Sequence, residues 1–318
     1  MAIATSWITG AHGFIGKHLA KSLSNSGQTV IGIGHGLWPI EESKQWGISD
    51  WLNGDIKPSN LHLLKDKYGE PDVIYHLAGG SSVGASLVSP REDFFRTVAT
   101  TSELLDWVRS HTPNTRLVAV SSAAVYGAGH TGMILESAKP LPYSPYGYHK
   151  LMMEDLFRSY ASNYGLKVVI ARLFSIYGTG LRKQLLWDLC SKLNEIPDTV
   201  TLGGNGAELR DWANVVDVAK ALTLISNQAS SLAPTINVGT GKGTSVTEIG
   251  RLVMKHWGMT NTASKLKFTG KARAGDPSSL ISDNTILTKL GFEWSISLDK
   301  GINAYAKWFQ SLRKYQSD

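Results

Sequence analysis

The chain has 318 residues, of which 42% are hydrophobic, and this suits one large α/β domain with a smaller lobe. Its formal net charge of +6 permits an anionic partner, but lysine and arginine are scattered along the chain, so we expect no nucleic acid partner. No apolar run approaches the roughly 20 residues that span a bilayer, and the N-terminus lacks a signal-peptide pattern, which predicts a cytoplasmic protein without a membrane partner.

Short β-branched runs alternate with amphipathic segments of helical length. The predicted strands cover residues 6–9, 29–33, 71–79, 115–122, 166–174 and 234–239, and helical spacing is strongest over 14–27 and 151–165. This alternation predicts an α/β fold with a doubly wound parallel sheet, as in a Rossmann domain, with helices on both faces. The rhythm breaks after residue 174, which predicts a smaller, mostly C-terminal α/β lobe. We assign residues 1–174 and 211–240 to the sheet domain, and 175–210 and 241–318 to the lobe.

A glycine-rich segment, TGAHGFIG, joins the first predicted strand to the first predicted helix. Glycine allows the tight turn, the close approach of a pyrophosphate and the packing of helix on strand, while the helix N-terminus offers free N–H donors. The segment therefore predicts a dinucleotide cofactor bound by Gly10, Gly13, Phe14, Ile15 and Gly16.

Two further segments fit the same cofactor. In GDI, Asp55 is positioned to accept from an adenine amino group and Ile56 to pack on the ring, although a turn-forming role for Asp55 remains open. HLAGG ends a strand at the carboxyl edge of the sheet, where ligands of open α/β folds bind. We therefore also expect Leu77, Ala78 and Gly79 to line the cofactor site.

Two segments carry the predicted chemistry, AVSSAAVYG and SPYGYHK. Tyr146 and Lys150 are four residues apart and so share one face of a helix. A nearby ammonium and a cationic nicotinamide both favour the phenolate form of the tyrosine, which can then exchange a proton with a sugar hydroxyl or carbonyl as hydride moves to or from the adjacent carbon. Ser122 completes the set by hydrogen bonding to the same substrate oxygen, and Ser121 is the competing choice.

These motifs, together with RLFSIYGTG, RDWANVVDV and RAGDPS, resemble those of the extended short-chain dehydrogenase/reductase family, in the branch that acts on nucleotide-linked sugars. The resemblance covers almost the whole chain. It implies an enzyme with catalytic roles for Ser122, Tyr146 and Lys150, and a homodimer formed through two helices per subunit. It also implies a nucleoside-diphosphate sugar as substrate, bound by the lobe and its surroundings through Ser82, Ser175, Arg210 and Arg273.

The chain departs from the family pattern at several positions. Ala123 and Ala124 occupy the places of the Asp-Glu pair that drives water elimination in 4,6-dehydratases, so a dehydratase is disfavoured. Ser175 replaces an asparagine of the RxFNxYG motif, and Thr97 replaces that of NVxGT.

The second predicted strand ends in Gly34-His35. In the family that this chain resembles, the members that use NAD have an aspartate at this place. A small residue followed by a basic one resembles the NADP-using members, because His35 can donate to a 2′-phosphate. We therefore expect NADP, with NAD not excluded.

The leading interpretation is an NAD(P)-dependent reductase of a nucleotide-linked 4-keto-6-deoxyhexose, acting at sugar C4. The alternative is a 4-epimerase similar to UDP-glucose 4-epimerase, which returns the hydride to the same sugar. A non-catalytic NADP-binding sensor is the alternative of another class. The nine histidines form no HExxH pair and Cys190 is the single cysteine, so we expect no metal. The base and sugar of the substrate are not predicted.

Overall fold

The computed structural model describes residues 3–195, 199–259, 265–271 and 276–314. Within these residues, a parallel sheet of seven strands has the order β11-β7-β5-β4-β1-β2-β3. The strands are β1 (Thr5–Thr9), β2 (Thr29–Gly34), β3 (Asp50–Asn53), β4 (Val73–His76), β5 (Arg116–Ser122), β7 (Lys167–Leu173) and β11 (Thr235–Val238). The predicted doubly wound parallel sheet is confirmed. Only the strand predicted over 71–79 is much shorter, because the chain turns away from the sheet after His76.

Successive side chains of a strand point to opposite sides of the sheet. Because helices cover both sides, both sets of side chains are buried. In β7, Val169 and Ala171 pack into one core, while Val168 and Ile170 pack into the other. The strand therefore appears in the sequence as a near-continuous apolar run.

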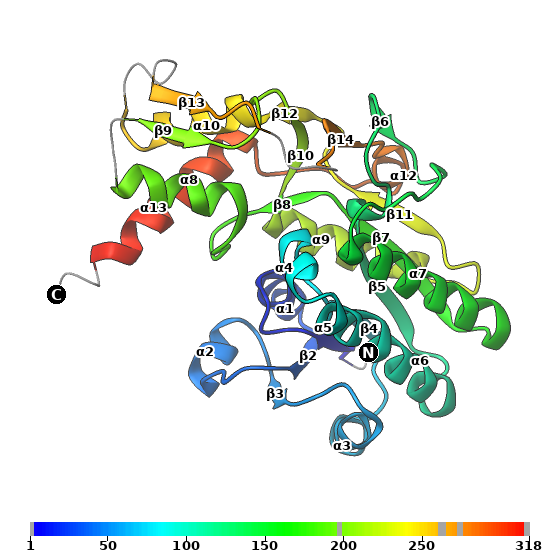
Figure 1. Ribbon diagram of the computed structural model, residues 1–318. Helices are drawn as coiled ribbons and strands as arrows, with labels where there is room; N and C mark the ends of the chain where they lie inside the picture. The colour runs from blue at the N-terminus through cyan, green and yellow to red at the C-terminus, as the bar shows by residue number, and fades with distance from the viewer. Residues whose placement is uncertain (1–2, 196–198, 260–264, 272–275, 315–318) are drawn as a thin grey trace.

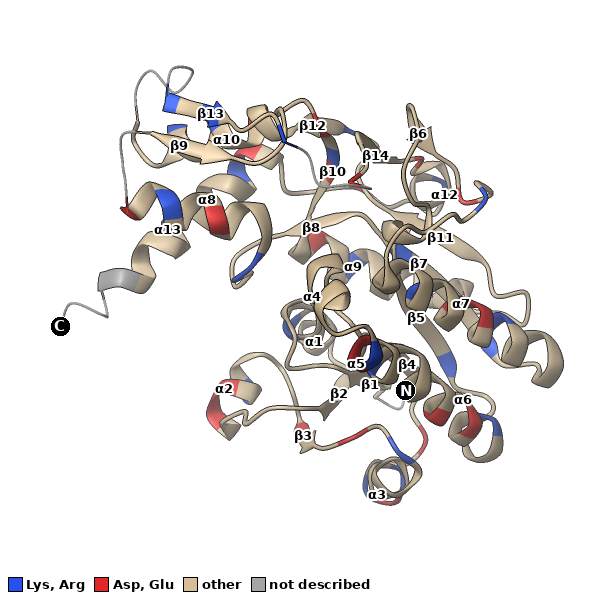
Figure 2. Cartoon of the chain, viewed as in Figure 1, with Lys and Arg blue, Asp and Glu red and all other residues tan. Residues whose placement is uncertain are grey.

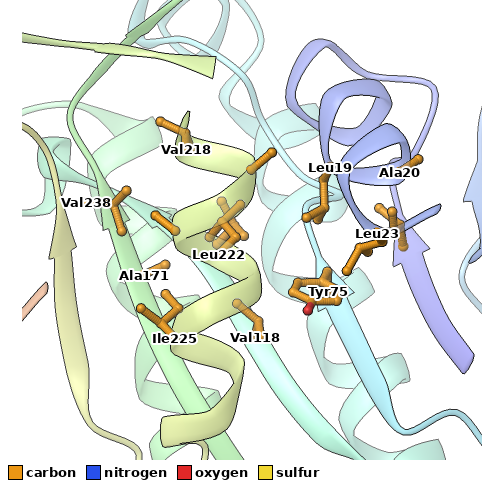
Figure 3. Packing of buried hydrophobic residues seen from close by; sticks show 14 of the residues in the cluster. Leu19, Ala20, Leu23, Tyr75, Val118, Ala171, Val218, Leu222, Ile225 and Val238 are labelled. Atoms are coloured by element: carbon orange, nitrogen blue, oxygen red, sulfur yellow. The ribbon is translucent and has the colours of Figure 1, made fainter. Parts of the chain in front are cut away.

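Helices cover each face of the sheet (Figure 1). One face carries α1 (Phe14–Asn25) and α9 (Val215–Ile225). Figure 3 shows Leu23 of α1 and Leu222 of α9 packed with Tyr75 and Val118 of the sheet. The other face carries α3 (Pro58–Tyr68), α6 (Thr100–His111) and α7 (Pro145–Tyr164). Short helices α2 (Ile40–Gln45), α4 (Val83–Val88) and α5 (Pro90–Phe94) lie in the connections, and α5 continues through a π-helical turn (Phe95–Ala99) into α6.

A smaller α/β part lies above the carboxyl ends of the large sheet in Figure 1. Its strands are β6 (Met133–Ile134), β8 (Ser175–Tyr177), β9 (Val200–Leu202), β10 (Leu209–Asn214), β12 (Gly243–Ser245), β13 (Leu266–Phe268) and β14 (Ser279–Ser282). Strands β12, β10, β14 and β6 pair in that order, β8 joins β10, and β13 pairs with β9. Helices α8 (Gln184–Glu195), α10 (Val246–His256) and α13 (Leu298–Lys314) share a core with them, whereas α12 (Thr285–Lys289) packs on the large sheet.

The smaller part takes two segments that the sequence assigned to the sheet domain, residues 133–134 and 211–214. Asp211 of β10 explains the second case. Its buried carboxylate accepts hydrogen bonds from Thr240 N at 2.7 Å, Gly241 N at 2.9 Å and the Ser282 hydroxyl at 2.5 Å. These bonds tie β10 to β14 and to the loop after β11. The domain boundaries themselves stay a prediction.

Figure 2 shows lysine and arginine on many elements of both parts rather than gathered in one region. In the described ranges, no helix is both long and apolar enough to cross a membrane. The same residues contain no group of three or more histidine, cysteine or acidic side chains arranged to hold a metal ion.

Candidate active site

The candidate site lies at the carboxyl edge of the large sheet, where the strand order reverses. Strand β1 neighbours both β2 and β4, so the connections after β1 and β4 run to opposite sides. Such a switch point is the usual ligand site of an open α/β sheet. The loops after β1, β4 and β5 meet here.

The loop after β1 has the form that a pyrophosphate requires. Helix α1 begins after Gly13, with no side-chain cap and no acidic residue in its first turn, so its first N–H groups are left for an anion. A Cβ on Gly16 would lie 2.5 Å from the carbonyl oxygen of Gly10, so only glycine lets the helix pack on the loop. Phe14, Ile15 and the glycines of this loop therefore fit a dinucleotide.

The loop after β4 lies against the first loop. The amide of Ala78 donates to the Thr9 hydroxyl at 3.2 Å, and the amide of Leu77 donates to the Thr9 carbonyl at 3.1 Å. The hydroxyl of buried Thr97, in the π-helical turn, accepts from the amide of Gly80 at 2.8 Å. Threonine therefore joins this helical segment to the loop after β4, at the position where the resembled family has asparagine. Leu77, Ala78 and Gly79 are thus held at the edge predicted for the cofactor.

Two residues predicted to contact the adenosine end contact each other. The Nε2 atom of His35 lies 3.1 Å from Oδ1 of Asp55, and both side chains are exposed. Ile56 is buried in the core below them. A histidine paired with a carboxylate is a weaker partner for a 2′-phosphate than an unpaired one. This contact joins the loop after β2 to the loop after β3, and the sequence pattern did not predict it.

Helix α7 presents Tyr146 in its first turn. The helix begins at Pro145 after Ser144, whose hydroxyl accepts from the amide of Gly147 at 3.2 Å. A Cβ on Gly147 would lie 2.7 Å from the carbonyl oxygen of Ala124, so this glycine brings the helix start against the end of β5. In addition, the Ser86 hydroxyl accepts from the amide of Tyr146 at 3.0 Å, a contact that sequence reasoning missed.

The two candidate serines of β5 have different surroundings. Ser121 is buried and donates to Oε1 of Glu154 at 2.6 Å, and Glu154 is bound through both oxygens by Arg172. Ser122 is partly exposed, its hydroxyl accepts from the amide of Ala124 at 3.2 Å, and it lies close enough to the phenol of Tyr146 to act on the pKa of that group. Both serines therefore contact α7, but Ser121 is engaged by Glu154 and Ser122 is the one next to the phenol of Tyr146.

Burial dominates the electrostatics of the pair on α7. It raises the pKa of Tyr146, and the nearby Ser122 hydroxyl, which acts to lower this pKa, only partly opposes the rise. The expected phenolate is therefore not favoured by these neighbours alone. Burial also lowers the pKa of Lys150 to about 8, against the influence of nearby Asp93 and Glu154. The Lys150 ammonium donates to the carbonyl oxygen of Val120 at 2.9 Å, beside Gly79.

The residues predicted to bind the substrate lie in several elements. Ser175 begins β8 at the carboxyl edge of β7, and Ser82 caps α4 by accepting from the amide of Ala85 at 3.3 Å. Arg210 lies on β10 with its guanidinium 3.6 Å from Asp276. Arg273 lies outside the described residues. Their substrate roles stay predictions.

A Rossmann sheet with a glycine-rich phosphate loop and a Ser-Tyr-Lys set defines an enzyme of the extended short-chain dehydrogenase/reductase kind. The chain belongs to the NAD dependent epimerase/dehydratase family, whose sequence model matches residues 7–239. The resemblance inferred from the motifs is thereby confirmed.

Curated relatives and solved structures match nearly the whole chain. The UDP-glucose 4-epimerase of Halalkalibacterium halodurans is 29% identical over 307 residues, covering 90% of this chain and 89% of that protein. MoeE5 in complex with UDP-glucuronic acid and NAD is 29% identical with a TM-score of 0.84, covering 97% of this chain and 100% of that one. The UDP-glucuronic acid 4-epimerase from Bacillus cereus, in complex with UDP-glucuronic acid and NAD, is 26% identical with a TM-score of 0.85, covering 97% and 99%.

These names bear on the interpretations left open by the sequence. They favour 4-epimerisation over the leading interpretation, the reduction of a 4-keto-6-deoxyhexose. Family membership also supports an enzyme over a non-catalytic sensor. The family is NAD(P)-dependent, and the two structures above contain NAD.

Proposed function

We propose that the protein is a 4-epimerase of UDP-linked sugars. The observation that carries the proposal is the meeting of Tyr146, Ser122 and Lys150 at the carboxyl edge of the sheet, beside the loop after β4. The named activities of the relatives support the epimerase over the reductase, since both reactions use the same three residues.

In this proposal, Tyr146 takes the proton from the C4 hydroxyl and later returns it to the C4 oxygen of the epimer. Ser122 donates to that oxygen and keeps it within reach of the phenol. The nicotinamide of a dinucleotide held by the glycine-rich loop would accept the hydride from C4 and return it to C4. Burial raises the pKa of Tyr146, and the positive charges of Lys150 and of a bound nicotinamide ring would oppose this rise.

For the cofactor we propose NAD rather than the NADP expected from Gly34-His35. The pairing of His35 with Asp55 supports this choice, because the imidazole of His35 already contacts the carboxylate of Asp55. The negative charge of that carboxylate would also repel a 2′-phosphate. The NAD in the two neighbouring structures agrees with it. Comparing the affinities of NAD and NADP by calorimetry tests the choice, and tighter binding of NADP would restore the original expectation.

The reaction is tested with UDP-glucose, UDP-galactose and UDP-glucuronic acid carrying deuterium at C4. An epimerase should interconvert a 4-epimer pair with the deuterium retained at C4 and no net use of added nicotinamide. Epimer formation with the label lost, or no turnover of any of the three, would contradict the proposal. Oxidation of NADPH or NADH with a nucleotide-linked 4-keto sugar would instead support the reductase.

A matched pair of tyrosine variants tests the catalytic assignment. Tyr146→Phe should lower kcat by about 10² to 10⁴-fold, as expected for the loss of a general acid–base group. Tyr164→Phe removes an exposed phenol from the far end of the same helix and should leave kcat unchanged. Equal rates for the two variants would rule out the role of Tyr146.

We also propose the homodimer that the resemblance implies. Apolar side chains that remain exposed on α7 and the neighbouring π-helical turn support it, namely Phe95, Tyr148 and Met152. Sedimentation should give a species of twice the chain mass, and Phe95→Glu should shift it toward the monomer.

A further inference from the structure

An acid–histidine pair lies next to the proposed catalytic residues and takes no part in the proposed reaction. Asp93 of α5 places Oδ2 at 2.6 Å from Nδ1 of His149 on α7. The two side chains are 6% and 12% exposed. His149 directly precedes Lys150 and follows Tyr146 by three residues, so it shares their helical turn.

The Asp93 carboxylate also touches the loop that lines the cofactor edge. A Cβ on Gly80 would overlap Oδ1 of Asp93, so the carboxylate packs directly on the backbone of this glycine. A Cβ on Gly79 would lie 3.4 Å from Nζ of Lys150. The carboxylate and the ammonium therefore flank the same pair of glycines.

The electrostatic influence of Asp93 reaches both ionisable groups of the site. After burial, which lowers the pKa of Lys150, Asp93 is the strongest influence that raises it, ahead of Glu154. Asp93 also adds to the burial that raises the pKa of Tyr146. The carboxylate thus helps the lysine to stay protonated in a buried place.

Among the described residues of α5, the turn after it and α7, the neighbouring charged side chains have partners of their own, and Lys183 donates to the carbonyl oxygen of Ser81 at 3.1 Å. On α5 and the turn that follows, Glu92 pairs with Arg96 at the surface, and the Arg91 guanidinium lies over the ring of Phe95. On α7, Glu154 is bound by Arg172 and Arg158.

We propose that Asp93, oriented by His149, is a positioning residue whose buried negative charge holds the Lys150 ammonium in its charged form beside Gly79. His149 acts through Asp93: its ring N–H fixes the carboxylate against the glycine backbone. The inference rests on the proposed function only for the catalytic meaning of Lys150. The charge state itself is a property of the folded chain.

The test is to follow the titration of Lys150 in the whole protein by NMR of ¹³Cε-labelled lysine, with Lys150→Arg to assign the signal. The wild-type midpoint should lie at about 8. Asp93→Asn should lower it by about one pH unit, the effect of losing an opposite charge at close range. Glu92→Gln removes a carboxylate one residue away that is exposed, and it should leave the midpoint in place.

A second variant keeps the proposal testable if Asp93→Asn does not fold. His149→Asn retains a side-chain N–H donor for Asp93, so the Lys150 midpoint should stay or rise. A fall of the midpoint in His149→Asn, or no fall in a folded Asp93→Asn, would overturn the inference.

A further readout uses turnover. Loss of the Asp93 charge should move the alkaline limb of the kcat/KM profile to lower pH by the same amount as the NMR midpoint, whereas a merely structural role would lower activity without moving the limb. The NMR measurement needs no substrate. Absence of epimerase activity would therefore contradict the proposed function while leaving the Asp93 inference to be judged on the midpoint.

Discussion

Gly147→Ala offers a sharp test of how the site is assembled. The added Cβ would lie 2.7 Å from the carbonyl oxygen of Ala124 and 2.8 Å from Cβ of Pro142, whereas ordinary contact begins at 3.4 Å. The start of α7 must therefore move by roughly 0.7 Å away from the end of β5. This displacement moves the phenol of Tyr146 away from the nearby Ser122 hydroxyl.

The expected effect is larger on catalysis than on stability. A misplacement of about 1 Å in an active site can cost on the order of 10²-fold, so we expect kcat to fall about 10- to 100-fold. Overpacking costs about 1–3 kcal/mol, while alanine in place of glycine within a helix returns about 0.5–1 kcal/mol. The free energy of unfolding should therefore fall by no more than about 2.5 kcal/mol.

The assay combines epimerase kinetics with chemical denaturation and cofactor binding. Gly84→Ala is the matched control, because a Cβ on this glycine of α4 would meet no atom within 4 Å. It should keep the wild-type kcat. If a folded Gly147→Ala keeps it too, close packing of α7 on the end of β5 does not position the phenol and the reasoning is refuted.

Three further outcomes follow from the contacts of the site. Ser121→Ala should lower the free energy of unfolding by about 1–3 kcal/mol and leave kcat nearly intact, because Glu154 loses a buried donor. Ser122→Ala should instead lower kcat with little loss of stability. Denaturation and kinetics measured on both variants decide between these expectations and the reverse. Activity should fall as pH rises through about 8, because Lys150 then loses its proton, and a pH–rate profile of an active Lys150→Arg enzyme that still shows this limb would exclude Lys150 as its source. Asp211→Ala should destabilise the protein by about 3 kcal/mol or more, since each of three donors that loses its buried acceptor costs about 1–3 kcal/mol. An unchanged denaturation midpoint would contradict this.

The spacing of residues close together in the sequence was enough to predict the sheet, the glycine-rich loop after its first strand and the Tyr146–Lys150 pair. Strand and helix periods are properties of neighbouring residues, and two side chains four apart on a helix share a face in any tertiary context. The glycine spacing around Gly13 reports a turn and a helix start, which are also local. These elements lie where the sequence indicated.

Tertiary structure decided the rest of the candidate site. The choice between Ser121 and Ser122 depends on which residue of α7 each serine meets, Glu154 for Ser121 and Tyr146 for Ser122, and no local pattern carries that information. The pairing of His35 with Asp55 likewise joins loops that follow different strands.

Asp93 illustrates the limit most clearly. It stands 56 residues before His149, and only the packing of α5 on α7 brings them to 2.6 Å. The sequence by itself thus determined the parallel α/β sheet, its phosphate loop and the phenol–ammonium pair, since each depends on short-range geometry. Only the tertiary structure decided which buried charges surround that pair, because the partner of a charge is chosen by the topology that carries distant segments together.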